Sequence, residues 1–99
     1  MTQGYNGWTN YETWRVNLEM FDGYDATATL QNMGADSREE MVEGLAVTLE
    51  GFAYEVLELP ENGFVQSIVG DFLRKVDWEE IAEHMVDDYL AENPIEEVA

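Results

Sequence analysis

The sequence predicts an all-α protein, a compact bundle of four or five helices. Three observations support this fold class: helix-start signals occur three times, apolar residues recur at steps of three and four, and no segment shows the sustained alternation of a strand. The 99 residues have room for one domain, and 45% of them are apolar. We expect a single acidic helical domain over residues 1–93 and an acidic tail over residues 94–99.

The first predicted helix begins at about Asn10, because Thr9 and Glu12 have the spacing of a capping box. Asp22 and the glycine after it end the run. Apolar side chains at steps of three and four predict one packed face, made of Tyr11, Trp14, Leu18 and Phe21.

A short second helix is predicted over residues 26–33. Asp25 precedes it as a cap and Gly34 closes it. Thr27 and Thr29 lower its helix propensity, so this element has the weakest signal of the five.

The third helix is predicted to be the longest and to form the spine of the fold. Ser37 and Glu40 form a second capping box at its start, and Pro60 ends it after about 20 residues. Its apolar stripe consists of Met41, Leu45, Leu49, Phe52 and Val56.

The fourth helix follows turn-forming residues at 61–63. Its apolar residues cover a wide arc: Phe64, Val65, Ile68, Val69, Phe72, Leu73 and Val76. A wide apolar arc is typical of a helix with neighbours on several sides, so we expect a central, well-buried position.

The fifth helix begins at a third capping box, formed by Asp77 and Glu80, and Asn93 followed by proline ends it. Its predicted inward face consists of Trp78, Ile81, Ala82, Met85, Tyr89 and Leu90.

Negative charge dominates the composition. The chain has 22 acidic residues against four Lys and Arg, for a formal net charge of −18. Residues 77–99 carry nine acids and no Lys or Arg, which is half of the net charge. Such a charge repels phosphate backbones, so we expect no direct binding to nucleic acid, and it attracts partner proteins that carry a basic groove.

The chain has no Cys, so nothing in it requires an oxidising compartment. It shows neither the pattern of a secretory signal nor an apolar run of about 18 residues. We therefore expect no membrane association and a cytoplasmic location.

The outward face of the fifth helix is the predicted partner-binding surface. It carries His84 and five acids, namely Glu79, Glu80, Glu83, Asp87 and Asp88. Glu79, Glu83 and Asp87 form a row with a spacing of about 6 Å, which resembles the row of phosphates on a nucleic-acid strand. The alternative is a solvated face that serves only solubility or adaptation to salt.

Four aromatic residues lie three apart near the N-terminus: Tyr5, Trp8, Tyr11 and Trp14. They pack into the core or anchor an interface, and packing is the favoured reading because aromatics on an amphipathic helix are usually buried.

Metal binding and catalysis have little support. Glu80, His84 and Asp88 could share a helix face, but one His on one helix makes a poor metal site. With no Cys, one His and no Gly-rich phosphate loop, only paired carboxylates could act, and no pair stands out. We expect no cofactor, no metal and no enzymatic activity.

Two segments carry a family resemblance: YNGWTNYETW at residues 5–14 and VDWEEIAEH at residues 76–84. They resemble the recurring motifs of a family of short phage, plasmid and prokaryotic proteins of unassigned function. An apolar residue often stands in that family where this chain has Glu19, which suggests a more exposed helix edge. The resemblance implies a mobile-element setting and brings no catalytic residues.

The leading functional hypothesis is based on the acidity of the chain and on the mobile-element setting together, because small acidic phage proteins often resemble DNA mimics. It is a phage-type inhibitor of a host defence system, anti-CRISPR or anti-restriction, whose acidic helices occupy the basic groove of a nucleic-acid-binding host protein. The alternative is a small accessory interaction protein that binds through an apolar patch. The sequence leaves the partner and the oligomeric state open.

Overall fold

The computed structural model describes residues 7–57 and 63–94, which form five helices. These are α1 (Tyr11–Met20), α2 (Thr27–Met33), α3 (Arg38–Leu57), α4 (Gly63–Arg74) and α5 (Trp78–Glu92). The predicted all-α fold is confirmed. The expected helix end at Pro60, the turn before α4 and the end of the acidic tail lie outside the described residues.

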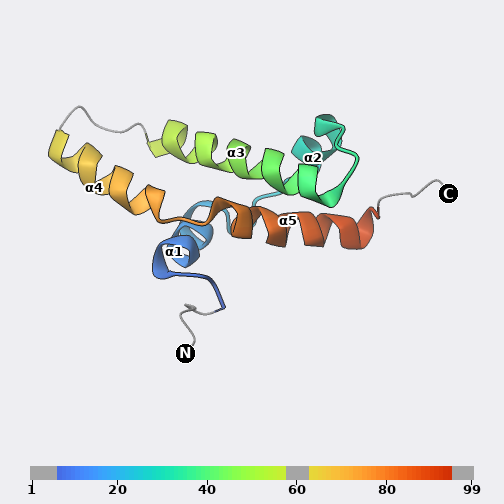
Figure 1. Cartoon of the computed structure of the whole chain (residues 1–99), viewed down its shortest axis with the longest axis horizontal. Coiled ribbons are helices and arrows are strands. Elements are labelled where there is room, and N and C mark those ends of the chain that lie inside the picture. Colours follow the sequence, from blue (N-terminus) through green and yellow to red (C-terminus); the bar gives the residue numbers. More distant parts are fainter. Residues whose placement is uncertain (1–6, 58–62, 95–99) are drawn as a thin grey trace.

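The centre of the fold is the antiparallel pair of α3 and α5, which lie side by side (Figure 1). α2 packs against α3, and α1 packs against α5. The molecule measures 54 × 35 × 20 Å, and its shortest dimension matches two helix layers of about 10 Å each. α3 is therefore the spine that its length predicts.

The α3–α5 contact supplies the most deeply buried part of the core. Six of its side chains have no exposed surface: Leu45, Leu49, Ala53, Ile81, Ala82 and Val86. Two of the six are alanines, whose small side chains let the helix axes approach closely. Val86 extends the inward face predicted for α5, whereas Phe52 and Val56 of the predicted α3 stripe are exposed.

The cap of α1 lies one residue later than predicted. The Asn10 side chain, not that of Thr9, accepts the orphan amide of Thr13, at 2.8 Å. The Thr9 backbone N–H instead donates to the Glu80 carboxylate at 2.9 Å. Asn is as good a helix cap as Ser and better than Thr, so the prediction failed in choosing between adjacent candidates.

The inward face of α1 also differs from the prediction. Its buried positions are Thr13 and Val16. Of the predicted face, Phe21 is buried, Trp14 is half-buried, and Tyr11 and Leu18 are exposed. The reason is Thr13: its hydroxyl donates to the Asn10 side chain at 2.6 Å and accepts the Asp77 backbone N–H at 2.8 Å, so a polar residue with satisfied hydrogen bonds occupies the inner face.

α2 begins one residue later than predicted, with Ala26 at the N-cap position, and ends at Gly34 as predicted. Asp25 accepts the Thr27 backbone N–H at 2.9 Å, and Gly34 adopts the left-handed conformation that ends many helices, with φ 67°. α2 approaches α3 closely at Gly44, where an added Cβ would lie 2.9 Å from the Met33 sulfur. Glycine at this position therefore leaves room for the end of the Met33 side chain.

The predicted capping residues also begin α3 and α5. Ser37 accepts the Glu40 amide at 3.1 Å and Asp77 accepts the Glu80 amide at 3.0 Å. The glutamates act differently from a full capping box, because Glu40 accepts from the Asp36 backbone and Glu80 reaches the N-terminal segment.

The central position predicted for α4 is wrong. Of its side chains only Leu73 is buried, and Figure 1 shows the helix at one end of the molecule. Phe64 is 74% exposed and Ile68 is 52% exposed. A wide apolar arc therefore did not indicate burial here, and a large apolar surface stays uncovered by the described residues.

Replacing Thr13 with Val should lower the free energy of unfolding by about 1–3 kcal/mol, because the partly buried Asp77 amide loses its acceptor, the fully buried Thr13 hydroxyl, while the side-chain volume is kept. Urea denaturation measures this change. Thr48→Val is the matched control, since this hydroxyl is exposed and bonds only within its own helix. Equal effects of the two variants would contradict the role assigned to Thr13.

Replacing Leu49 with Ala should cost about 2–5 kcal/mol, because this side chain is fully buried between α3 and α5. Val47→Ala, two residues away and 70% exposed, should change stability by less than about 0.5 kcal/mol. Thermal or urea unfolding of both variants checks the orientation of α3. A large loss of stability in the Val47→Ala variant would refute that orientation.

Candidate functional site

The five acids predicted as a binding surface on α5 lie in four different surroundings. Glu79 and Glu83 line a furrow beside α3, together with acids of that helix. Asp87 pairs with an arginine, Glu80 binds the N-terminal segment, and Asp88 lines a separate cavity. The predicted single row is therefore only partly present as free carboxylates.

An acidic furrow runs between α3 and α5. We use this name for the hollow of about 160 Å³ whose rims are Glu39 and Glu43 on α3 and Glu79 and Glu83 on α5. All four side chains are exposed. They face each other because the antiparallel pair buries the apolar stripes of both helices and leaves the adjacent positions at the edge of the contact.

The furrow continues along the helix pair into a second hollow. This hollow shares Glu43 and Glu79 with the furrow and adds Glu50, Asp77 and Lys75. The two hollows form one continuous surface on which six carboxylates outnumber two basic residues, Arg38 and Lys75. Negative potential is concentrated there, because two helices contribute acids to the same strip.

One end of the furrow carries a positive charge that the sequence pattern of α5 does not reveal. Arg38 forms a two-pronged ion pair with Asp87, with Nε to Oδ1 at 2.8 Å and an Nη nitrogen to Oδ2 at 3.1 Å. The hydrogen bonds from Arg38 lower the pKa of the Asp87 carboxyl. Asp87 is thus ion-paired with Arg38 of α3, whereas Glu79 and Glu83 line the furrow; the binding role of these acids stays a prediction.

Glu80 has a structural role. Its carboxylate accepts the Thr9 backbone N–H at 2.9 Å, and its side chain is half-buried. This bond joins α5 to the segment that precedes α1. The Glu80 carboxylate is therefore engaged within the chain, and its role in partner binding stays a prediction.

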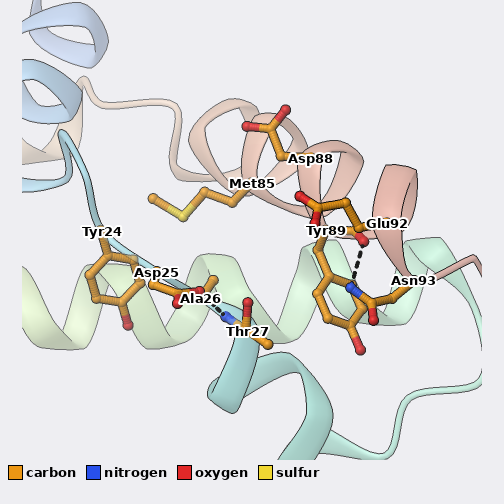
Figure 2. Close-up of a pocket in the computed structure, with 9 residues that line it drawn as sticks. All are labelled: Tyr24, Asp25, Ala26, Thr27, Met85, Asp88, Tyr89, Glu92 and Asn93. Atoms are coloured by element: carbon orange, nitrogen blue, oxygen red, sulfur yellow. Dashed lines mark hydrogen bonds between the residues drawn. The ribbon is translucent and has the colours of Figure 1, made fainter.

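Asp88 lies on a different side of α5 from the furrow. It lines a cavity of about 200 Å³ between α5 and the segment before α2 (Figure 2). The other polar groups of this cavity are Asp25, Thr27, Tyr89, Glu92 and Asn93. Hydrogen bonds with the side chain and with the backbone N–H of Thr27 lower the pKa of the Asp25 carboxyl. The backbone carbonyl of Tyr89 accepts a hydrogen bond from the Asn93 side chain.

The sequence pattern Glu80, His84, Asp88 does not become a cluster. Glu80 binds Thr9, Asp88 lines its own cavity, and the His84 ring lies 4.4 Å from the Trp8 ring. Within residues 7–57 and 63–94, no group of three or more His, Asp or Glu side chains is arranged to hold a metal ion.

The N-terminal aromatics are divided between core and surface. Trp8 is half-buried and packs against the core. The Tyr11 ring is tilted against the Trp14 ring, with 5.8 Å between ring centroids, and lies edge-on to Phe72 of α4 at 6.3 Å. Tyr11 and Phe72 thus form an aromatic contact between α1 and α4. Tyr5 lies outside the described residues.

A second surface feature is an apolar groove between α1, the end of α3 and α4. It has a volume of about 370 Å³, and most of its lining is apolar: Val16, Met20, Leu57, Ile68, Val69, Phe72 and Leu73. Arg15 and Glu19 stand at its edge as an ion pair at 2.6 Å, with Glu19 exposed as the family resemblance suggests. Sequence reasoning missed this groove because it placed α4 in the core.

Sequence reasoning also missed Glu39 and Glu43. Their spacing of four residues puts them on one side of α3, and Glu50 follows seven residues later. That signal was present, but helical periodicity shows only that residues face outward. It does not show which outward residues lie beside another helix.

The family comparison covers nearly the whole chain. A model described as a family of unknown function, DUF7249, matches residues 1–97. The chain belongs to this family. No curated protein and no solved structure matches the chain. The family description assigns no activity, so it assigns no role to any residue of this chain.

None of the helices in the described part of the chain is long and apolar enough to cross a membrane.

The Asp87 carboxyl should titrate below its ordinary range, because the ion pair with Arg38 favours the charged form. A pKa below the unfolded value means that the pair stabilises the fold above that unfolded pKa and stops doing so as the pH falls through the folded pKa. Carbon-13 NMR titration of the Asp side chains measures this. Arg38→Gln should raise the pKa of Asp87, and an unchanged titration in that variant would contradict the pairing.

Proposed function

We propose that the chain is a binding protein rather than an enzyme, and that its acidic furrow docks on the basic nucleic-acid-binding groove of a partner protein. The observation that carries this proposal is the pair of carboxylate rows contributed by α3 and α5. Occupation of the groove excludes nucleic acid by competition.

The spacing of the two rows supports mimicry of a phosphate backbone. Carboxylates four residues apart are separated by about 6 Å along a helix, so two facing rows supply about one charge per 3 Å of furrow. One strand of B-DNA carries one charge per about 3.4 Å. The rows of two helices together approach this density of charge along the furrow, whereas the row of one helix alone does not.

The long-range electrostatic field of the chain also favours docking on a basic groove. A formal charge of −18 attracts a basic groove and raises the association rate, most strongly at low salt. Of the four basic residues, three are paired with acids in the described part of the chain: Arg15, Arg38 and Arg74. Little positive charge is left to oppose this attraction.

The sequence resemblance to phage and plasmid proteins adds a biological setting to the proposal, that of a mobile genetic element in its host. In that setting the partner is a nucleic-acid-binding component of a host defence system, and the chain is an anti-CRISPR or anti-restriction inhibitor in the host cytoplasm. This extension rests on analogy with other small acidic proteins.

The accessory-protein alternative has one specific observation in its favour, the apolar groove beside α4. A partner that docks there would use hydrophobic burial, and the acidity would serve solubility. Salt dependence separates the two functions, because groove occupation by carboxylates weakens steeply with salt and apolar docking does not.

The test begins with a tagged chain that captures its partner from host lysate. The furrow variant Glu39→Gln, Glu43→Gln, Glu79→Gln, Glu83→Gln should then bind that partner about 100-fold more weakly, which corresponds to about 2.7 kcal/mol. Its helicity should be preserved, because all four side chains are exposed. Isothermal titration calorimetry and circular dichroism provide these measurements.

The control removes the same charge from elsewhere: Asp22→Asn, Glu55→Gln, Asp88→Asn, Glu92→Gln. These residues are exposed and lie outside the furrow, so this variant should keep most of its affinity. Duplex DNA should displace the wild-type protein from the partner. Equal losses in both variants, or simultaneous binding of DNA and protein, would refute occupation of the groove by the furrow.

A further inference from the structure

Val47 is an exposed apolar side chain in the middle of α3. It is 70% exposed, and among the large hydrophobic side chains of the described residues only Phe64 is more exposed. Val47 does not serve the core, because the fully buried Leu45 and Leu49 make the contact of α3 with α5. The described part of the chain therefore gives Val47 no packing role.

Two hollows meet at Val47. Val47 and Glu43 both line the second hollow beside α5, of about 600 Å³, and a hollow of about 480 Å³ between the end of α2 and α3. Gly44 and Gly51, one turn before and one turn after Val47, have no side chain that could cover it. An added Cβ at Gly51 would meet nothing within 4 Å, so packing in the described structure does not require glycine there. Val47 is thus a low apolar ridge that stays open to a partner.

Carboxylates surround this apolar ridge. Glu43 lies one turn before the valine on α3 and Glu50 lies one turn after it, so both share its side of the helix. Glu79 of α5 lines the second hollow, and Glu40 lines the hollow beside α2. Among the described residues that line the two hollows, five are acids and one, a lysine, is basic. An apolar side chain inside a negative rim is complementary to a group that is apolar along its length and positive at its end.

We propose that Val47 and the carboxylates around it form a docking surface for the lysine and arginine side chains of the partner's basic groove. Lys and Arg pack their methylene stems on apolar surface while their charged ends stay with water or a counter-charge. Here the stems lie on Val47, and the charged ends reach Glu43, Glu50 and Glu79. This inference rests on the proposed function and adds to it an apolar contact at the centre of the acidic surface.

The apolar contact adds selectivity that carboxylates alone lack. A net charge of −18 attracts every kind of cation, and an exposed ion pair contributes little affinity because both charges are well hydrated. Contact between a methylene stem and Val47 removes apolar surface from water, and salt does not screen this contribution. Basic protein side chains therefore bind this surface more tightly than small hydrated cations do.

The first test measures binding of a hexalysine peptide to the full chain by isothermal titration calorimetry at low salt. Val47→Ser should weaken this binding about three- to tenfold, because burial of one apolar side chain is lost, and it should leave helicity unchanged because Val47 is exposed. Val56→Ser is the matched control, since Val56 is in the same helix, is 51% exposed and lines neither hollow, and it should bind as the wild type does.

Cobalt(III) hexaammine is the matched control ligand, because it carries charge and has no methylene stem. It should bind the wild type and Val47→Ser with equal affinity. Hexalysine binding that Val47→Ser leaves unchanged, or an equal loss for hexalysine and the cobalt complex, overturns the assignment of an apolar contact to Val47.

The second test uses the captured partner and separates this inference from the proposed function. Val47→Ser should lower affinity for the partner by a similar factor, and carbon-13 NMR of the complex should show shifted methyl signals for Val47 and unshifted ones for Val56. A partner that loses affinity for the furrow variant with four Gln substitutions but binds Val47→Ser as it binds the wild type overturns the docking role of Val47 and leaves the proposed function standing. A partner that binds both variants as tightly as the wild type overturns both proposals.

Discussion

The structure depends on one hydroxyl, that of Thr13, which joins the beginnings of two helices. It donates to Asn10, the cap of α1, and accepts the backbone N–H of Asp77, the cap of α5. The Asn10 amide also donates to the Lys75 carbonyl at 2.7 Å. Because these groups satisfy one another in a partly buried place, the crossing of α1 and α5 is fixed at the point where α5 starts. The side of α5 that faces α3, and hence the furrow, follows from that orientation.

Repulsion between the carboxylates of the furrow destabilises the fold, and burial of the apolar core beneath them offsets this repulsion. Each pair of like charges four residues apart on a helix costs a few tenths of a kcal/mol, and Glu39, Glu43, Glu79 and Glu83 add repulsion between helices. Each fully buried aliphatic side chain in the α3–α5 contact contributes about 1.5–3 kcal/mol. The stabilisation from the buried core is therefore much larger than the repulsion between the carboxylates of the furrow. Carboxylates of this kind are not needed for the fold, which is consistent with a role in recognition.

The sequence predicted the parts of this structure that depend on neighbours along the chain. Helix starts at Ser37 and Asp77 and the end at Gly34 follow from local backbone hydrogen bonding, which short motifs report directly. Contacts between distant segments were not predictable in this way. Arg38 and Asp87 are 49 residues apart, and nothing in the pattern of α5 shows that its row is neutralised there. The apolar arc of α4 gave the same signal that a buried helix gives, because periodicity records apolar residues and not what covers them.

Salt acts differently on the two surfaces of this molecule. Added salt weakens the attraction of the acidic furrow for a basic groove, because it screens exposed charges over a shorter distance. Salt leaves docking on the apolar groove beside α4 largely unchanged, because apolar burial drives that contact. The two surfaces share no lining residue, so one can be occupied while the other stays open.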